Sequence, residues 1–303
     1  TLACPSRART SPTPTATDQG TCGSAPLCAN LRYAAGFGRR GGLLLGFFEL
    51  IMRADQLLVE RGLAASRSQA QRLIAAGLRW RVGSGAFRAV AKNGDEVPEA
   101  AELQLQDDAE ARYVSRGGLK LEGALAATGW DVTGWRCLDV GQSTGGFTDC
   151  LLQRGAAQVV GLDVGHAQVH PRIRQDARVV CIEGVNAREL VPGDERIPDA
   201  AQGFDLMVGD VSFISLTLVL PGVVPLLKAG GRLLMLVKPQ FELQPGQVGK
   251  GGIVRDVALY AHVEDRIRQA CAALGLQVQA WMDSPIAGGD GNREFFVQAV
   301  KAI

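Results

Sequence analysis

The sequence predicts an α/β protein in which a seven-stranded, doubly wound sheet follows a small α+β domain. From residue 136 onward, short apolar runs alternate with stretches of helical periodicity, which is the pattern of strands joined by crossover helices. The first run breaks into a turn of small residues, Gly141 to Gly146, and a helical pattern follows at once. No clear helix separates the last two runs, so we expect a hairpin at one end of the sheet.

Composition and charge indicate a soluble two-domain protein. The 303 residues, 47% hydrophobic and 21% charged, are sufficient for two domains with a large core. The net charge is only +1, but residues 52–97 hold eight Lys/Arg against four Asp/Glu, which suggests a polyanionic partner for this part. The seven cysteines follow no metal-ligand or disulfide spacing, so we expect no metal site and a reducing, cytoplasmic location.

Residues 1–51 are rich in Ser, Thr, Pro, Gly and Ala and show no stable periodicity. Their one long apolar run, from Leu43 to Met52, is too short to span a membrane, and Glu49 interrupts it. Our hypothesis is that Met52 is the natural start and that residues 1–51 are an upstream or disordered extension.

Residues 52–97 predict two helices followed by short strands. Arg53 to Arg61 is amphipathic, and Gly62 ends it. Ser66 to Gln69 has the pattern of a capping box and begins a second helix, which Gly77 ends. Three short β-type stretches follow around the Asn-Gly turn at residues 93–94.

The pattern Arg-x-Asp-x-x-Leu, followed by Ser-Arg-Ser-Gln-Ala-x-x-x-Ile-x-x-Gly, resembles the alpha-L RNA-binding domain of a small-subunit ribosomal protein and many RNA-modifying enzymes. The resemblance covers residues 52–97. Such a two-helix face presents basic side chains to phosphates and reads few bases. The alternative is a solvated basic face without a ligand. The RNA-binding candidates are Arg53, Ser66, Arg67, Gln71, Arg72 and Lys92.

Residues 98–114 are acidic and contain few core residues, so we expect a linker that runs into a strand at Arg112 to Val114. Ser115 begins a helix that extends to Gly129, and it opens the second domain, residues 115–303. Lys120 lies on the first turn of this helix, where spacing alone would make it a surface lysine. The strand candidates are Cys137–Val140, Val159–Asp163, Val179–Ile182, Phe204–Asp210, Arg232–Lys238, Leu276–Trp281 and Glu294–Val300.

The turn after the first strand separates two cofactor classes. Dinucleotide enzymes need Gly-x-Gly-x-x-Gly so that pyrophosphate can reach the helix N-terminus, and Gly141 to Gly146 does not fit this spacing. S-adenosylmethionine has no phosphate and needs a tight turn beside its methionine end. Both classes use an acid after the second strand, where Asp163 lies, so Asp163 does not separate them. Alternatively, Asp163 only caps its strand and Asn186 is an ordinary turn residue. The S-adenosylmethionine candidates are Gly141, Gln142, Ser143, Thr144, Gly145, Asp163, Val164, Asn186 and Asp210.

Four charged residues, Lys120, Asp210, Lys238 and Glu294, stand at strand ends or helix starts. Asp210 and Lys238 each end an apolar run, so both lie at the carboxyl edge of the sheet, where open α/β folds bind ligands. Charges that end apolar strands are costly unless they are partnered. We therefore expect these two lysines and two acids to satisfy one another.

Five motifs occur in order: Ser-Arg-Gly-Gly-Leu-Lys, Asp-Val-Gly-x-Ser-Thr-Gly-Gly-Phe-Thr-Asp, Asp-Val-Ser-Phe-Ile-Ser, Leu-Val-Lys-Pro-Gln-Phe-Glu and Ser-Pro-Ile-x-Gly-x-x-Gly-Asn-Arg-Glu-Phe. Together they resemble the TlyA family, also called hemolysin A, of the FtsJ-like ribosomal RNA methyltransferases, from Met52 to about Ile303. The resemblance implies a Rossmann-like methyltransferase domain that uses S-adenosylmethionine to methylate cytidine 2′-hydroxyls in ribosomal RNA. Its catalytic Lys-Asp-Lys-Glu tetrad carries over to Lys120, Asp210, Lys238 and Glu294. One departure is Gln142, where the family more often has alanine; its polar side chain would contact either the cofactor or only the next loop.

A ribose 2′-hydroxyl must lose its proton as it attacks a methyl group, and Lys238 is the expected base. Lys120 would hold the hydroxyl, Asp210 would orient Lys238, and Glu294 would position Lys120 or the ribose. The 2′-hydroxyl distinguishes RNA from DNA, so the expected partners are ribosomal RNA or ribosomal subunits and neither DNA nor a membrane. The alternatives are a non-catalytic RNA-binding or ribosome-assembly protein, a membrane-lytic hemolysin, and a dehydrogenase.

Overall fold

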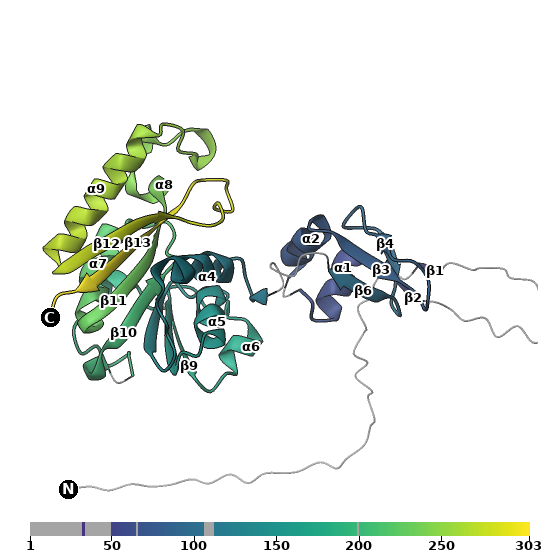
Figure 1. Cartoon of the computed structure of the whole chain (residues 1–303), viewed down its shortest axis with the longest axis horizontal. Helices are drawn as coiled ribbons and strands as arrows, with labels where there is room; N and C mark the ends of the chain where they lie inside the picture. Colours follow the sequence, from purple (N-terminus) through teal and green to yellow (C-terminus); the bar gives the residue numbers. More distant parts are fainter. Residues whose placement is uncertain (1–31, 34–49, 65, 106–111, 199) are drawn as a thin grey trace, which may run out of the picture.

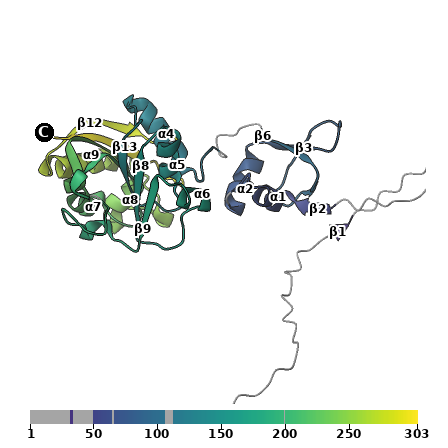
Figure 2. The ribbon, with the colours of Figure 1, turned by 90° about the horizontal axis from the view of Figure 1, so that it is seen from below.

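The computed structural model describes residues 32–33, 50–64, 66–105, 112–198 and 200–303. Figures 1 and 2 show the same two bodies from perpendicular directions: a small domain that ends near residue 105, and a larger α/β domain that follows it. The described residues therefore confirm the predicted fold class of an α/β domain preceded by a small α+β domain.

The small domain packs two helices, α1 (Ala54–Glu60) and α2 (Arg67–Ala75), against short antiparallel strands. Leu58 and Leu73 of these helices are completely buried in its core. The Ser66 hydroxyl accepts a hydrogen bond from the backbone N–H of Gln69 and caps α2, as the sequence pattern predicts. The strands form two sheets, ordered β1–β2–β5 and β4–β3–β6. Their bounds are β1 (Arg32–Tyr33), β2 (Leu50–Arg53), β3 (Leu78–Arg81), β4 (Arg88–Ala89), β5 (Glu96–Pro98) and β6 (Glu102–Leu105).

Two boundaries predicted from the sequence are wrong in part. Leu50 already belongs to β2 and pairs with β1, so strand residues occur within the predicted extension 1–51; residues 1–31 and 34–49 of it lie outside the described residues. The predicted linker contains β6, in which Leu103 pairs with Trp80 of β3. Leu103 and Leu105 pack against the small-domain core, a two-residue apolar period that the surrounding acids obscure in the sequence.

The larger domain is built on a seven-stranded sheet ordered β12–β13–β11–β10–β7–β8–β9. The five neighbouring strands from β11 to β9 pair in parallel, and β13 is antiparallel to both of its neighbours, which confirms the predicted hairpin at one end. The order of the strands reverses at the boundary between β7 and β10, the place where doubly wound sheets bind ligands. The bounds are β7 (Arg136–Val140), β8 (Gln158–Asp163), β9 (Val179–Glu183), β10 (Phe204–Gly209), β11 (Leu227–Val237), β12 (Leu276–Asp283) and β13 (Phe295–Lys301).

Helices cover both faces of this sheet (Figure 1). Leu121 of α4 (Gly117–Thr128) and Leu151 of α5 (Gly146–Gln153) share one core with Cys137 of β7, whereas the next strand residue, Leu138, faces the core formed with α7 (Leu216–Val223) and α9 (Ala258–Ala273). The central strands are thus buried on both sides. No helix among the described residues has the length and apolarity needed to cross a membrane.

The predicted strand at Arg112 to Val114 is wrong, because Arg112 is helical and Tyr113 and Val114 form a bend. Its backbone groups bond to side chains instead of to a neighbouring strand: the Val114 N–H donates to Asp149 Oδ2 at 2.9 Å, and the Tyr113 carbonyl accepts from Gln69 Nε2 at 3.2 Å. A Cβ added to Gly118 would lie 2.2 Å from the Tyr113 ring, so the start of α4 packs directly on this bend.

Candidate active site

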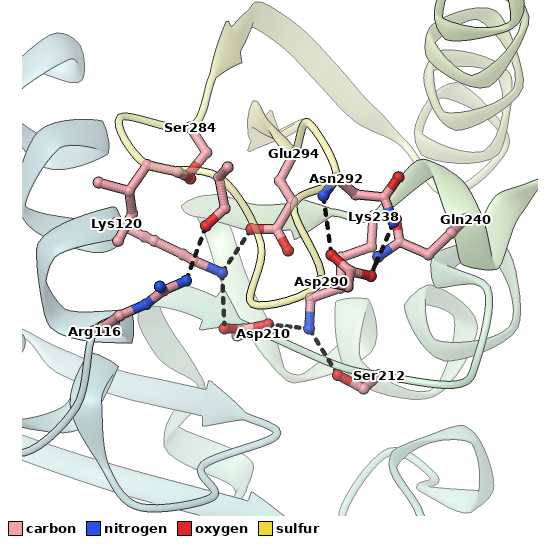
Figure 3. Close-up of polar contacts among 12 residues, drawn as sticks. Arg116, Lys120, Asp210, Ser212, Lys238, Gln240, Ser284, Asp290, Asn292 and Glu294 are labelled. Atoms are coloured by element: carbon pink, nitrogen blue, oxygen red, sulfur yellow. Dashed lines mark hydrogen bonds and ion pairs between the residues drawn. The ribbon is translucent and has the colours of Figure 1, made fainter. Parts of the chain in front are cut away.

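The four charged residues singled out in the sequence meet at the carboxyl edge of the large sheet (Figure 3). Lys120 extends from the first turn of α4, Asp210 follows β10, Lys238 follows β11, and Glu294 immediately precedes β13. Parallel strands present their carboxyl ends on one side, and the antiparallel β13 brings its amino end to that same side. The topology therefore gathers residues that are as much as 174 positions apart in the chain.

The charges form a row of alternating sign. Lys120 Nζ lies 2.6 Å from Glu294 Oε2 and 3.9 Å from Asp210 Oδ2. Lys238 Nζ lies 2.6 Å from Asp210 Oδ1 and donates to Ser212 Oγ at 2.7 Å. Each ammonium group thus has a carboxylate partner, which offsets the cost of placing charges at the ends of apolar strands.

The two ends of this row differ in burial. The side chains of Lys120 and Glu294 are only 7% and 3% exposed, whereas those of Lys238 and Asp210 are 12% and 23% exposed. Burial raises the pKa of Glu294, and the adjacent Lys120 ammonium opposes that rise. The Lys120–Glu294 pair therefore lies at the buried end of the row, and a substrate hydroxyl can reach the more exposed Lys238–Asp210 end.

A glycine-rich turn supports Glu294 from behind. A Cβ added to Gly288 would lie 2.7 Å from Glu294 Oε1, so only glycine leaves room for the carboxylate. Asn292 closes the turn and also donates to the Gly252 carbonyl at 2.8 Å, and Gln240 donates to Asp290 Oδ2 at 3.1 Å (Figure 3). These bonds join the segments that follow β11 and precede β13.

A cavity of about 460 Å³ opens beside the row at the carboxyl ends of β7, β8 and β10. Its walls combine apolar side chains with two acids, Asp163 and Asp210, and the described residues that line it include no lysine or arginine. Such a lining suits a cationic, phosphate-free nucleoside better than a pyrophosphate. Of the predicted cofactor contacts, the lining includes Gly141, Ser143, Asp163, Val164, Asn186 and Asp210.

The helix N-terminus after the glycine turn is covered. A Cβ added to Gly146 would lie 2.1 Å from Ser115 Oγ and 3.0 Å from the Gly118 nitrogen, so the start of α4 packs against the start of α5. A pyrophosphate would need this position, so the close packing argues against dinucleotide binding. The glycine turn also lies close to the end of β10. A Cβ on Gly141, whose φ is +83°, would lie 2.9 Å from the Asp210 carbonyl oxygen, so this approach requires glycine.

Asp163 caps the loop around it and still faces the cavity. Its two carboxylate oxygens accept the Ser143 and Gly165 backbone N–H groups, each at 2.7 Å. A carboxylate has about four acceptor sites, so these two bonds leave capacity for ligand hydroxyls. Asn186 likewise combines both roles, since it caps a 3₁₀ turn by accepting the Arg188 N–H at 3.2 Å and also lines the cavity.

Three predicted cofactor contacts lie away from the cavity. Gln142 is buried and donates to the Thr148 hydroxyl at 2.9 Å, and its amide packs over Gly161, where a Cβ would lie 2.0 Å away. Thr144 lines a different cavity between the two domains, and Gly145 packs on Ile173. The cause is the tight turn, in which successive residues point in opposite directions, so the residues next to Gly141 and Ser143 cannot all face one ligand.

The structure adds Phe213, the fourth residue of the motif Asp-Val-Ser-Phe-Ile-Ser, which the sequence analysis did not single out as a site residue. It lines the cavity, is 91% exposed, and has a φ of +63°, which is unusual for a bulky residue. Its ring lies 5.1 Å from that of Phe241. Glu242, which is 3% exposed, accepts the Ser215 hydroxyl at 2.5 Å and thereby anchors the end of this loop. Gln168, Ser212 and Val211 are further lining residues that the sequence analysis missed.

The RNA-binding candidates lie on the small domain. Arg53 and Arg67 both contact the buried Asp55, and the exposed Lys92 lies on the turn next to the start of α1. Ser66 caps α2 and, with Arg72, lines the cavity between the two domains. Gln71 is exposed on α2.

Comparison with known proteins agrees with this geometry. Residues 113–301 match the FtsJ-like methyltransferase family. Over 246 residues the chain is 45% identical to the 16S/23S rRNA (cytidine-2′-O)-methyltransferase TlyA of Mycobacterium tuberculosis. The match covers 81% of this chain and 88% of that protein. The chain is 38% identical over 254 residues to Hemolysin A of Brachyspira hyodysenteriae, covering 82% of this chain and 100% of that one. A solved candidate hemolysin from Streptococcus thermophilus is 40% identical, with a TM-score of 0.63 over 83% of this chain and 89% of that chain.

The sheet order, the acid-lined cavity at its switch point and these matches define a methyltransferase with a Rossmann-like fold. The chain belongs to the FtsJ-like methyltransferases, in the branch that contains the TlyA proteins.

Proposed function

We propose that this protein transfers a methyl group from S-adenosylmethionine to the 2′-hydroxyl of cytidine riboses in ribosomal RNA. The observation that carries the proposal is the Lys238–Asp210–Lys120–Glu294 row, which lies beside an acid-lined cavity. The choice of substrate is supported by the similarity to the Mycobacterium tuberculosis enzyme, whose name specifies cytidine 2′-O-methylation of 16S and 23S rRNA.

S-adenosylmethionine fits the cavity in charge and polarity. Its sulfonium supplies an electrophilic methyl group, and the acidic lining favours a cation. Asp163 would accept the ribose hydroxyls, and the small turn residues Gly141 and Ser143 would pass the methionine end. Val164 and Asn186 would contact the nucleoside, and Asp210 would lie between the cofactor and the lysines.

The row then divides the work of proton removal. Lys238, in its neutral amine form, would accept the proton of the 2′-hydroxyl and become an ammonium, and Asp210, at 2.6 Å, would hold the amine toward the cavity and pair with the ammonium that forms. Lys120 would donate a hydrogen bond to the same oxygen and stabilise its developing negative charge. Glu294 would keep Lys120 in place through their 2.6 Å contact. The small domain would bring ribosomal RNA, in the cytoplasm, to this edge of the sheet.

The test uses ribosomal subunits from a bacterial strain that lacks this gene. The full-length protein and S-adenosylmethionine are added to purified 30S and 50S subunits, and 2′-O-methylated nucleotides are mapped in the extracted RNA. The expected result is methylation at defined cytidines that are unmodified without the protein. Methylation of bases only, or no transfer to either subunit, would refute the proposal.

A further inference from the structure

The small domain contains a buried carboxylate that holds two arginines together. The Asp55 side chain is 0% exposed, at the start of α1. Arg53 donates to it through Nε and Nη2, both at 3.0 Å, and Arg67 donates through Nη2 at 3.0 Å. The two arginine side chains are 48% and 58% exposed, so their guanidinium groups are fixed at one edge and open to solvent at the other.

The backbone around Asp55 is equally constrained. The Ala54 N–H donates to the Asp95 carbonyl at 2.9 Å and the Asp55 N–H to the Asn93 carbonyl at 3.1 Å. A Cβ added to Gly94 would lie 3.2 Å from Arg53 Nη1, so the turn packs on the guanidinium. Two arginines from two different segments therefore contact one buried acid.

We propose that Asp55 is a positioning residue for RNA binding, which presents Arg53 and Arg67 as a preformed clamp for backbone phosphates. The inference rests on the proposed function, because it takes ribosomal RNA as the ligand. Phosphate recognition by arginine depends on the direction of its N–H fork as well as on its charge. Asp55 engages two of the five N–H groups of Arg53 and leaves outward-facing groups for the ligand.

The direction in which Asp55→Asn changes RNA affinity distinguishes this positioning role from a simple effect of charge. Asp55→Asn removes a negative charge from a surface that binds a polyanion, so charge alone predicts tighter binding. Loss of the clamp predicts the opposite, because both long side chains would have to be ordered when RNA binds. A purely structural role predicts lower thermal stability with no loss of RNA affinity by the folded protein.

The experiment measures binding of the full chain to protein-free ribosomal RNA extracted from bacterial subunits, between about 50 and 200 mM salt. We expect Asp55→Asn to bind about five- to tenfold more weakly at fixed salt, from the ordering of two side chains. The slope of log affinity against log salt should fall by up to about one, as for a lost phosphate contact. Binding equal to or tighter than that of the wild type would overturn the proposal.

Two further variants keep the test decisive. Glu60→Gln removes one exposed negative charge from the other end of α1 and should bind no more weakly than the wild type. Arg53→Lys combined with Arg67→Lys preserves charge but removes the forks, and it should weaken binding as Asp55→Asn does; this variant decides the question if Asp55→Asn does not fold. Unchanged affinity in the double variant would refute the clamp. Failure of the wild type to methylate ribosomal RNA would instead refute the proposed function.

Discussion

Two aspartates, one in each domain, are equally buried and yet behave in opposite ways. Asp55 of the small domain and Asp139 of β7 are 0% and 1% exposed. The guanidinium of Arg53, with that of Arg67, holds the pKa of Asp55 below its usual value. No cation among the described residues pairs with Asp139: burial raises its pKa to about 7, although the Thr148 hydroxyl donates to it at 2.7 Å. Burial by itself therefore does not decide whether a carboxyl is charged; the partner does.

The same comparison extends to the two functional surfaces. In the larger domain the candidate catalytic charges neutralise one another and are largely buried, so they can carry chemistry without attracting solvent ions. In the small domain the buried acid directs half-exposed cations outward. The first arrangement suits proton transfer at one atom, and the second suits binding to many phosphates.

The largest effect on activity is expected from Lys238→Ala, which removes the amine proposed as the base at the accessible end of the row. Methyl transfer should fall by about 10²- to 10⁴-fold, the usual contribution of a positioned base. Binding of S-adenosylmethionine should persist, because Lys238 does not line the cavity. Single-turnover transfer and calorimetric cofactor binding measure the two quantities. Lys228→Ala, at the opposite end of β11, is the matched control and should stay active. Retained turnover in Lys238→Ala would exclude it as the base.

Glu294→Ala tests whether the buried Lys120–Glu294 pair is energetically coupled. The variant leaves the Lys120 ammonium, 7% exposed, with only Asp210 at 3.9 Å. We expect a loss of about 3 kcal/mol in the free energy of unfolding, the lower range for a broken buried pair. Adding Lys120→Ala should recover part of it, because the unpaired charge is gone. Urea unfolding of all three proteins measures the coupling, and simple addition of the two losses would contradict it.

Asp139→Asn should stabilise the larger domain at neutral pH. Because the pKa of Asp139 is raised in the folded state, its favourable contribution is present below about pH 4 and is lost as the pH rises toward about 7. Asparagine keeps an acceptor for Thr148 and does not ionise, so its advantage should grow over this range, to at most about 4 kcal/mol. Urea unfolding at several pH values measures it. An advantage that shrinks as the pH rises would show that Asp139 is ionised in the folded protein.

Asp55→Asn should show the opposite pH dependence with a smaller effect. The pKa of Asp55 is lowered in the folded state, so its contribution is present above about pH 4 and is lost as the pH falls. The variant should lose about 1–3 kcal/mol near pH 7, the value of hydrogen bonds to charged groups. Hydrogen exchange of small-domain amides from pH 7 down to about pH 2 measures the difference, which should stay constant above about pH 4 and narrow below it. A difference that does not narrow below about pH 4 would mean that the arginine contacts do not control Asp55.

Much of this organisation could be predicted from the sequence because it depends on local pattern. The alternation of apolar runs with helical periods placed the strands of the large sheet and its terminal hairpin. Asp210 and Lys238 could be placed at one edge because parallel strands end together. By contrast, β6 was missed because its two apolar positions lie among acids. For Gln142 the sequence left open a contact with the cofactor or with the next loop, and in the structure its side chain donates to Thr148.

Residue type and spacing were enough to show which residues can ionise, where the strands end and which elements alternate. The partner of each charged group became evident only in the folded protein. Asp55 and Asp139 are the same residue in similarly buried positions, and although Arg53 is only two residues from Asp55 in the sequence, only the folded structure brings its guanidinium, and that of Arg67, onto the carboxylate. Arg67 reaches Asp55 from another helix, and Glu294 reaches Lys120 from 174 residues away. Such contacts depend on how distant segments pack, and the energy of a charge depends on its nearest partner.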